Sequence, residues 1–502
     1  MAGGKTPPAV ETRELRDAEV SLPIKVGFRD AFHWYCHMDK ATTVAALRAG
    51  IIDSAVAERT TRAVLAVIEA GENQATRPTD YLDIQAMLLR EGGAEISRMH
   101  SGRSRQDMLA TLHRLLLRDR VLAVLKQVNE VRAAMLELGE RHADTLVPAY
   151  TNGVQAQPVT FGHLMSGYEA ALCRSAQRVA DNYERLNLSP LGAAALATSR
   201  FPVDRSALAA LMGFDGCVEN AFDAAQLAVI DVGVEVAQVA ALIALSVGTF
   251  IQDLHAQFHH ARNWIFIDDA SLLSPSTLMP QKRNPVVLNR ARLLASEVVG
   301  ASMSATLAAH NVCSGMTDYK RYDAARSLDL TLSLTKEVLD ILRGIRIDAD
   351  AAKEEIDLGY STASELAATL QEMAGVPLAV GHRFASLLVD TARRDRRIFA
   401  QIPFSEVLEL YDRATTQLEA ELYKRFPLTE HEFRAAVDAE TMVVNYRGLG
   451  GSSPGEVRRM LGAGKKKLEE DAAWRAARVS SLAAAEDRLE SAFALLTVEE
   501  AT

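Results

Sequence analysis

The sequence is poor in several features that would point to particular protein classes. Its 502 residues include four cysteines, and none forms a CxxC pair, which gives no zinc signature and fits a reduced cytoplasmic protein. Aromatic residues make up only 6%, and runs rich in β-branched residues are few, so the composition points to helices. Basic residues are not in excess, since 55 Lys and Arg stand against 65 Asp and Glu. The net charge of −10 argues against a nucleic-acid partner, which would need a basic face.

Export and membrane signals are also lacking. Residues 1–10 contain no apolar segment of the kind found in signal peptides, which predicts that the protein is not exported. The most apolar stretch, residues 236–252, is shorter than the roughly 20 residues that cross a bilayer, and acidic residues flank it. We expect a buried helix within a bundle, no membrane partner and a cytoplasmic location.

Long helical patterns are what the sequence does contain. Residues 108–140, 161–186 and 223–261 repeat apolar side chains at spacings of three and four and contain no proline. Helices of this length are typical of an extended bundle with an oligomeric core. We predict an all-α fold of three domains: an N-terminal helical domain (1–108), a central helical bundle that forms the oligomer core (109–360) and a C-terminal helical domain (361–502).

The segment with the most informative pattern is residues 274–285, SPSTLMPQKRNP. It predicts a loop that leads into a helix, with Asn284 as the N-cap and Pro285 at the first helical position. The free N–H groups of that helix, beside Lys282 and Arg283, would make an anion site with the hydroxyl of Ser276 six residues before the lysine. An ordinary surface loop with a capped helix is the alternative.

Two further polar segments add to this pattern. Residues 100–107, HSGRSRQD, carry two arginines, two hydroxyls and an amide that could bind carboxylates through charge-assisted hydrogen bonds. A salt-bridge cluster at a helix entry would explain the same residues, and Arg103 in particular could pair with a neighbouring carboxylate. Residues 150–158, YTNGVQAQP, end an irregular segment before the helix from residue 161 and alone indicate little.

Together, these segments resemble the fumarase/aspartase superfamily, and the argininosuccinate lyase branch in particular. The family pattern SSxMPQKxNP is similar to residues 276–285, HTGRSRND to residues 100–107, and YTHLQxAQP in part to residues 150–158. Further matches lie in residues 190–224, 363–367 and 450–454, so the resemblance covers nearly the whole chain.

The resemblance implies a homotetramer in which each active site draws one loop from each of three subunits. The implied reaction is a reversible β-elimination from a small dicarboxylate of the succinyl type, usually releasing fumarate, with no metal or cofactor. In the family, the serine that matches Ser276 is the general base, and the residues that match Lys282 and Asn284 hold the carboxylate next to the proton that is removed. The other candidate substrate-binding residues are Ser104, Arg105, Gln106, Thr151, Asn152, Gln157, Asn289 and Tyr319.

The sequence departs from the family on the side of the leaving group. Asn152 stands where the family has its general acid, a histidine. Asn289, seven residues beyond Lys282 and expected two turns on along the same helix face, stands where that histidine's glutamate partner would be. Asparagine has no protonation equilibrium near neutral pH, so this matched pair of changes indicates a reshaped function. His163, His310, Tyr319 and Tyr322 are alternative proton donors, and we interpret His163 as structural.

These departures lead to a hypothesis about the substrate. A guanidine leaving group must take up a proton because its conjugate acid has a pKa above about 12. We therefore expect a carbon–nitrogen lyase that acts on a substituted succinate and releases fumarate, with a leaving group other than arginine. A conventional argininosuccinate lyase and a catalytically silent tetramer are the alternatives, and retention of Ser276, Lys282 and Asn284 counts against the silent form.

Overall fold

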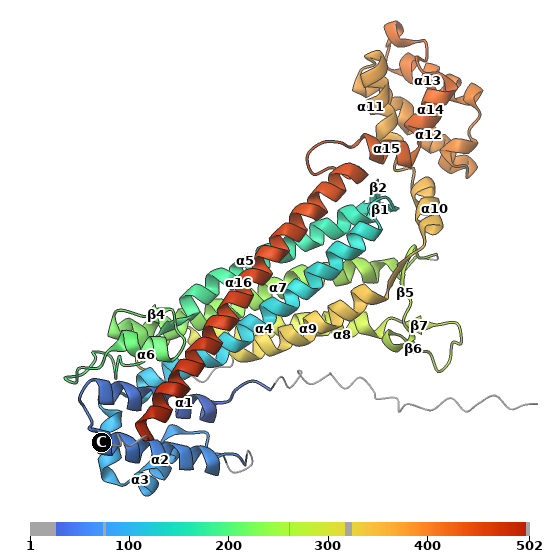
Figure 1. The fold of residues 1–502 in the computed structure, drawn as a ribbon. Helices are drawn as coiled ribbons and strands as arrows, with labels where there is room; N and C mark the ends of the chain where they lie inside the picture. The colour runs from blue at the N-terminus through green and yellow to red at the C-terminus, as the bar shows by residue number, and fades with distance from the viewer. Residues whose placement is uncertain (1–26, 74–76, 261, 317–323, 498–502) are drawn as a thin grey trace, which may run out of the picture.

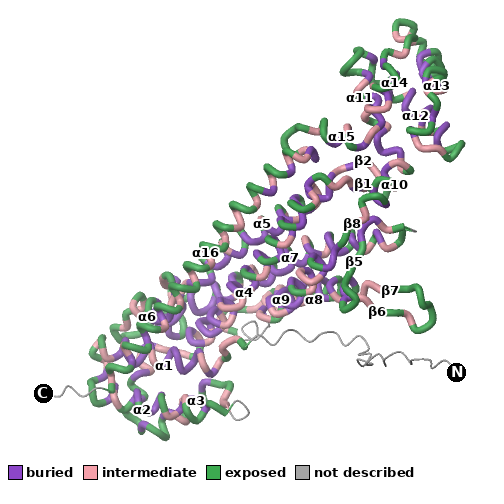
Figure 2. The backbone as a smooth tube through the Cα atoms, turned by 45° about the vertical axis from the view of Figure 1, so that its right-hand side comes forward, coloured by how far each residue is buried: buried purple, intermediate pink, exposed green. Residues whose placement is uncertain are grey.

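The computed structural model describes residues 27–73, 77–260, 262–316 and 324–497. It is an elongated bundle of long helices with a small helical unit at each end, as Figures 1 and 2 show. The all-α prediction is confirmed, since the strands are short and pair only two at a time.

Five long helices form the bundle and bury its main core. They are α4 (Arg105–Arg141), α5 (Phe161–Leu186), α7 (Ala228–Gln257), α8 (Val286–Ala309) and α9 (Ala324–Gly344). The predicted helix 161–186 is confirmed at both ends, and α4 extends the predicted helix 108–140 by a few residues. The predicted helix 223–261 extends beyond the observed one, because α7 ends at Gln257. After that residue the N–H groups of Phe258, His259 and His260 bond to carbonyls three residues back, and the turns tighten.

The apolar stretch predicted to be a buried helix lies in α7, which contacts α4, α5, α8 and α9. In the part of the chain that the structure describes, residues 223–257 form the one helix long and apolar enough to span a membrane by length and composition. Of its most apolar window, 61% is buried inside the molecule, which is the environment of a bundle core.

A second core lies at one end of the bundle, in the part drawn in blue in Figure 1. It is built on α1 (Ala31–Arg48), α2 (Ser54–Ala70) and α3 (Tyr81–Gly92). Each of these helices begins after an aspartate whose carboxylate accepts a backbone N–H of the first turn, which stabilises the helix start. The short helix α6 (Arg205–Leu211) and the end of the last long helix complete this core.

A third core lies at the opposite end, beyond α10 (Ala349–Gly359). Its helices are α11 (Ala363–Ala374), α12 (Leu378–Asp395), α13 (Phe404–Gln417), α14 (Glu430–Ala436) and α15 (Ala439–Asn445). The chain then returns along the whole bundle as α16 (Pro454–Ala494), which packs on α4 and α5 and reaches α1. The domain boundaries near residues 108 and 360 stay predictions.

Four two-stranded pairs cap or connect the helices. The hairpin β1–β2 precedes α5, and the hairpin β6–β7 precedes α8 (Figure 1). The bounds are β1 (Leu146–Thr151), β2 (Val154–Thr160), β3 (Leu188–Ser189), β4 (Gly216–Cys217), β5 (Ile265–Ile267), β6 (Ser274–Pro275), β7 (Arg283–Asn284) and β8 (Ile345–Ile347). The two hairpins place candidate site residues, and β3–β4 and β5–β8 join distant segments.

Candidate active site

The loop that carries Ser276 and Lys282 projects from the end of the bundle between β6 and β7, as Figure 2 shows in green. The Oγ of Ser276 accepts hydrogen bonds from the backbone N–H groups of Leu278, at 3.3 Å, and Met279, at 3.0 Å. Donors aimed at a hydroxyl oxygen favour its ionised form. Ser276 therefore has local support for the alkoxide that a serine base requires.

The predicted cap of the following helix is wrong by one residue. Helix α8 begins at Val286 after Pro285, whose ψ of 67° is not helical, so Asn284 cannot act as the N-cap. Instead Asn284 lies in β7, and its Nδ2 donates to the carbonyl of Ser274 at 3.1 Å. The side chain thus closes the base of the Ser276 loop, and its second N–H remains for another acceptor.

Lys282 and Asn289 also lie differently from the prediction. Lys282 is in the loop, where its N–H donates to the Met279 carbonyl, and Asn289 is on the first turn of α8. The two side chains therefore do not share a helix face. Both are exposed, so each is available to a ligand or to another copy of the chain.

Ser104, Arg105 and Gln106 open the long helix α4 at the far end of the bundle. Ser104 is its N-cap and forms a capping box with Asp107. Arg105 pairs with Asp80 at 3.0 Å, with both side chains about half exposed, and Gln106 Nε2 donates to the Gly315 carbonyl at 3.4 Å. These contacts fit the helix-entry interpretation, while the exposure of Arg105 leaves its guanidinium accessible.

Asp107 joins this helix start to a distant loop. One oxygen accepts the N–H of Ser104 at 2.8 Å, and the other accepts the N–H groups of Gly192, at 2.9 Å, and Ala194, at 3.1 Å. Burial raises the pKa of Asp107 to about 6, against the effect of these three donors. These hydrogen bonds hold the loop at residues 190–194, which includes a match to the family, against the 100–107 segment.

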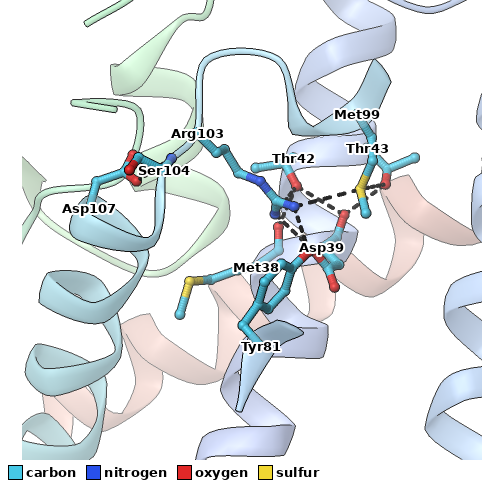
Figure 3. A network of polar contacts seen from close by, with 9 residues as sticks. All are labelled: Met38, Asp39, Thr42, Thr43, Tyr81, Met99, Arg103, Ser104 and Asp107. Atoms are coloured by element: carbon cyan, nitrogen blue, oxygen red, sulfur yellow. Dashed lines mark hydrogen bonds and ion pairs between the residues drawn. The ribbon is translucent and has the colours of Figure 1, made fainter. Parts of the chain in front are cut away.

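The side chain of Arg103 is enclosed within the protein. Its guanidinium donates to Asp39 Oδ1 and Thr42 Oγ1, each at 2.8 Å, and to the Tyr81 hydroxyl at 2.8 Å (Figure 3). The side chains of Arg103 and Asp39 are 2% and 1% exposed. Burial alone would lower the pKa of Arg103, but its contacts with Tyr81 and Asp39 raise it. Of the two interpretations of Arg103, the structure therefore shows the second, in which the arginine pairs with a neighbouring carboxylate.

The segment at residues 150–158 belongs to a two-stranded hairpin, so the expectation that the chain here lacks strands is wrong, although the strand register shifts by one residue between Ala149 and Tyr150. Thr151 pairs with Val154 across a two-residue turn of Asn152 and Gly153, with φ of 53° and 74°. Tight hairpin turns with positive φ at both central residues favour Asn-Gly. Asn152 and Thr151 are exposed, and Gln157 Nε2 donates to the Tyr446 hydroxyl at 3.1 Å.

Within one chain the Ser276 loop, the 100–107 segment and the β1–β2 hairpin lie apart. Helix α4 alone, at 37 residues, separates Ser104 from the β1–β2 hairpin by roughly 55 Å. The hairpins β1–β2 and β6–β7 are at the same end of the bundle but separate (Figure 1).

Among the alternative proton donors, Tyr319 and Tyr322 lie outside the described residues. His163 is on the first turn of α5, where burial lowers its pKa and leaves Nδ1 without a hydrogen bond among the described residues.

Sequence reasoning missed the residues that hold the 100–107 segment, above all Asp39 and Tyr81. They come from α1 and α3, and no local motif joins them to Arg103. A signal existed, because Asp39 is a lone carboxylate within a helix whose residues from Phe32 to Ala46 are nearly all buried. A charge on such a face requires a partner.

Comparison with known proteins places these segments in a family. The profile of a lyase family matches residues 43–300, more than half of the chain. Argininosuccinate lyase of Cupriavidus necator is 32% identical over 427 residues, which cover 83% of this chain and 86% of the relative. The chain belongs to this lyase family.

A second argininosuccinate lyase and a solved structure support the same family. Argininosuccinate lyase of Methanosarcina mazei is 29% identical over 474 residues, covering 92% of this chain and 91% of the relative. The crystal structure of EDDS lyase in complex with formate superposes with a TM-score of 0.85 at 26% identity, covering 93% of this chain and 92% of that one. This lyase is thus a member of the fumarase/aspartase superfamily in its argininosuccinate lyase-like branch, an enzyme of the carbon–nitrogen lyase class.

Proposed function

We propose that this lyase catalyses reversible β-elimination from a substituted succinate of the N-substituted aspartate type, releasing fumarate, and that its leaving group is not arginine. The observation that carries the proposal is the Ser276 loop, in which two backbone N–H groups bond to Oγ beside Lys282. A variant of EDDS lyase with bound fumarate, 26% identical to this chain, supports the product.

In the proposed reaction, Ser276 removes the proton from the carbon next to a carboxylate. The electron pair moves into that carboxylate, where Lys282 and the second N–H of Asn284 would stabilise the added charge. The pair then forms the double bond of fumarate as the carbon–nitrogen bond breaks. Asn152 and Asn289 cannot supply a proton to the departing nitrogen, so the leaving group would have to depart with little help from an acid.

The sharing of sites between subunits is part of the proposal. The loops that carry Ser276, Ser104 and Thr151 lie apart in one chain, so a site that uses all three needs other copies. Exposed apolar side chains on two bundle helices support such contacts, since monomeric proteins rarely expose them in groups. They are Leu242 and Leu245 of α7 and Leu293, Met303 and Leu307 of α8. We infer a homotetramer with sites shared by three subunits, and the cytoplasmic location stays a prediction.

The test is fumarate formation by the purified protein, offered argininosuccinate, nitrosuccinate and several N-substituted aspartates. We expect fumarate from a substrate other than argininosuccinate, and a fall in kcat of roughly 10²- to 10⁴-fold in Ser276→Ala. Ser274→Ala is the matched control, because the Ser274 hydroxyl bonds only weakly to the neighbouring carbonyl of Pro275, at 3.4 Å. Turnover that survives in Ser276→Ala would exclude Ser276 as the base.

A conventional argininosuccinate lyase is the second candidate, because curated relatives of 29–32% identity carry that name. Rapid release of fumarate from argininosuccinate by the unmodified protein would favour it over the proposal. The double substitution Asn152→His with Asn289→Glu separates the two further. A gain of argininosuccinate turnover in that variant would support loss of the acid, whereas no change in an already active enzyme would support the second candidate.

A further inference from the structure

A pocket of about 400 Å³ opens between the hairpin β1–β2, the first turns of α5 and the last turns of α7. It contains no residue of the Ser276 loop or of the 100–107 segment, and its rim includes Asn152 and Gly153. This volume is within the range of pockets that enclose small organic molecules. The pocket therefore lies beside one group of candidate site residues, and nothing in the proposed reaction uses its interior.

The walls of the pocket are apolar and largely aromatic. They include the buried side chains of Phe161, Met165, Phe250, Leu254 and Trp264, each 7% exposed or less. Such walls favour a ligand with an apolar body, and aromatic faces also attract cations.

The polar groups that face the pocket are mainly hydrogen-bond acceptors. Tyr168 donates its hydroxyl hydrogen to Asp253 Oδ2, and the Asp253 carboxylate is exposed at the pocket, where a ligand can reach Oδ1. Gln257 is 6% exposed, and its Oε1 has no partner in the described part of the chain. A buried acceptor without a donor is costly unless a ligand or water supplies one.

The hydroxyl hydrogens of Tyr150 and Tyr168 are already donated to carboxylates, so neither is available to a ligand. Tyr150 donates to Glu355 and accepts from Trp264 Nε1 at 3.2 Å. Burial and the adjacent carboxylates raise the pKa of Tyr150 and of Tyr168 well above the usual range, so both hydroxyls stay protonated and committed. Among the described residues that line the pocket, His260, 3.6 Å from Glu355, is the one with a basic side chain, and none is a lysine or an arginine.

We propose that this pocket binds an organic cation, a protonated amine or guanidinium with a flat apolar body. The cationic head donates to Asp253 Oδ1 and to the orphaned Oε1 of Gln257, while the body packs among the aromatic walls. A neutral molecule of the same shape lacks the charge that Asp253 attracts, and an anion is repelled. The cation has two possible sources: an amine that leaves from the substrate and takes up its proton from water, because Asn152 and Asn289 cannot supply one, or a free amine that acts as an effector.

The test uses calorimetric titration of the full-length protein with 2-phenylethylamine, 2-phenylethanol and 3-phenylpropionate. We expect the amine to bind at least tenfold more tightly than the alcohol, and the carboxylate not to bind. Asp253→Asn should weaken amine binding at least tenfold and leave alcohol binding unchanged, because the amide keeps an acceptor for Tyr168. Glu137→Gln, which removes an exposed carboxylate from α4, is the matched control and should change neither.

Equal binding of amine and alcohol, or amine binding that survives unchanged in Asp253→Asn, would overturn the proposal. These titrations need no turnover, so their failure leaves the proposed reaction untouched.

A second arm, which rests on the proposed reaction, separates the two sources. The protein is incubated with the amine and excess fumarate, and products are analysed by mass spectrometry. In the reverse reaction the amine nitrogen bonds to one alkene carbon and loses a proton, and the other alkene carbon gains one. An N-substituted aspartate that is absent with Ser276→Ala assigns the pocket to the leaving group. Amine binding without this adduct assigns it to an effector.

Discussion

Arg103 and Arg105 are two residues apart in one segment, yet they differ in what they can do. Arg103 is enclosed with Asp39 and Tyr81, while Arg105 and its partner Asp80 are each about half exposed. An enclosed ion pair with one partner removed leaves an uncompensated charge, whereas an exposed pair is screened by water. Of the two, Arg105 is the arginine that a substrate carboxylate can reach.

This contrast predicts unequal effects of the same substitution. Asp39→Asn should lower the free energy of unfolding by about 3–5 kcal/mol, because the Arg103 guanidinium stays buried without its counter-ion. Asp80→Asn should lower it by less than about 1 kcal/mol, since asparagine also caps a helix well. Urea denaturation of the two variants measures the difference. Equal effects would mean that the Asp39–Arg103 pair contributes nothing beyond a surface contact.

The buried His37 and the half-buried His100 predict how stability depends on pH. Burial lowers the pKa of His37 to about 3 and of His100 to about 2. The unfolded chain takes up protons on both below pH about 6.5, while the folded chain does not. Their contribution is therefore complete above that pH and is lost as the pH falls, by up to about 1.4 kcal/mol per pH unit for each histidine.

Urea denaturation between pH 7 and pH 5 tests this dependence. His100→Gln should make the fall in unfolding free energy less steep, whatever its effect at pH 7. His382→Gln, at an exposed position on α12, should leave the slope as it is. An unchanged slope in His100→Gln would show that His100 titrates alike in the folded and unfolded chain.

Secondary structure was predictable where one pattern decided it. The helix at residues 161–186 could be read from apolar spacing alone, because its buried face runs without interruption from Phe161 to Leu186. The hairpin before it was missed, since Pro148 and Pro158 argue against strands and the alternation is short. The Asn-Gly pair at residues 152–153 was the available signal, and it was interpreted as altered chemistry rather than as a turn.

The candidate site was predictable in its residues and not in its contacts. The motifs named Ser276, Lys282 and Ser104, and the contacts within the Ser276 loop are local. The partners that hold the Ser104 segment come from distant parts of the chain, as Gly192 does for Asp107. The predicted cap at Asn284 failed for a local reason, because Pro285 keeps a non-helical ψ and the side chain bonds back across the hairpin.

The β1–β2 turn can be tested through its glycine. Gly153 has a φ of 74°, and no atom lies within 4 Å of the position that a β-carbon would occupy. Gly153→Ala should therefore destabilise the protein by about 1 kcal/mol or more through backbone strain alone. Gly167→Ala, on α5 with equally open surroundings and no positive φ, should stabilise it by roughly 0.5–1 kcal/mol. Thermal or urea unfolding distinguishes the two, and the same sign for both would exclude strain at the turn.

The shape of the whole molecule bears on how its loops can meet. An elongated bundle puts the Ser104 segment at one end and the Ser276 loop at the other, so no bending of a single chain brings them together (Figure 1). The exposed leucines of α7 and α8 lie along the same bundle. Packing copies side by side and antiparallel through these helices would bury the leucines and bring opposite ends of different subunits together.

Shared sites predict that two inactive variants restore each other. Ser276→Ala and Thr151→Val are made with different affinity tags, co-expressed, and the hybrid oligomers are isolated by passing them over both columns. If one site takes these two loops from different subunits, random mixing leaves about one site in four with both loops intact, and about a quarter of the activity returns. If both loops came from one subunit, every site would carry one lesion. Hybrids no more active than either variant alone would therefore exclude sharing between these loops.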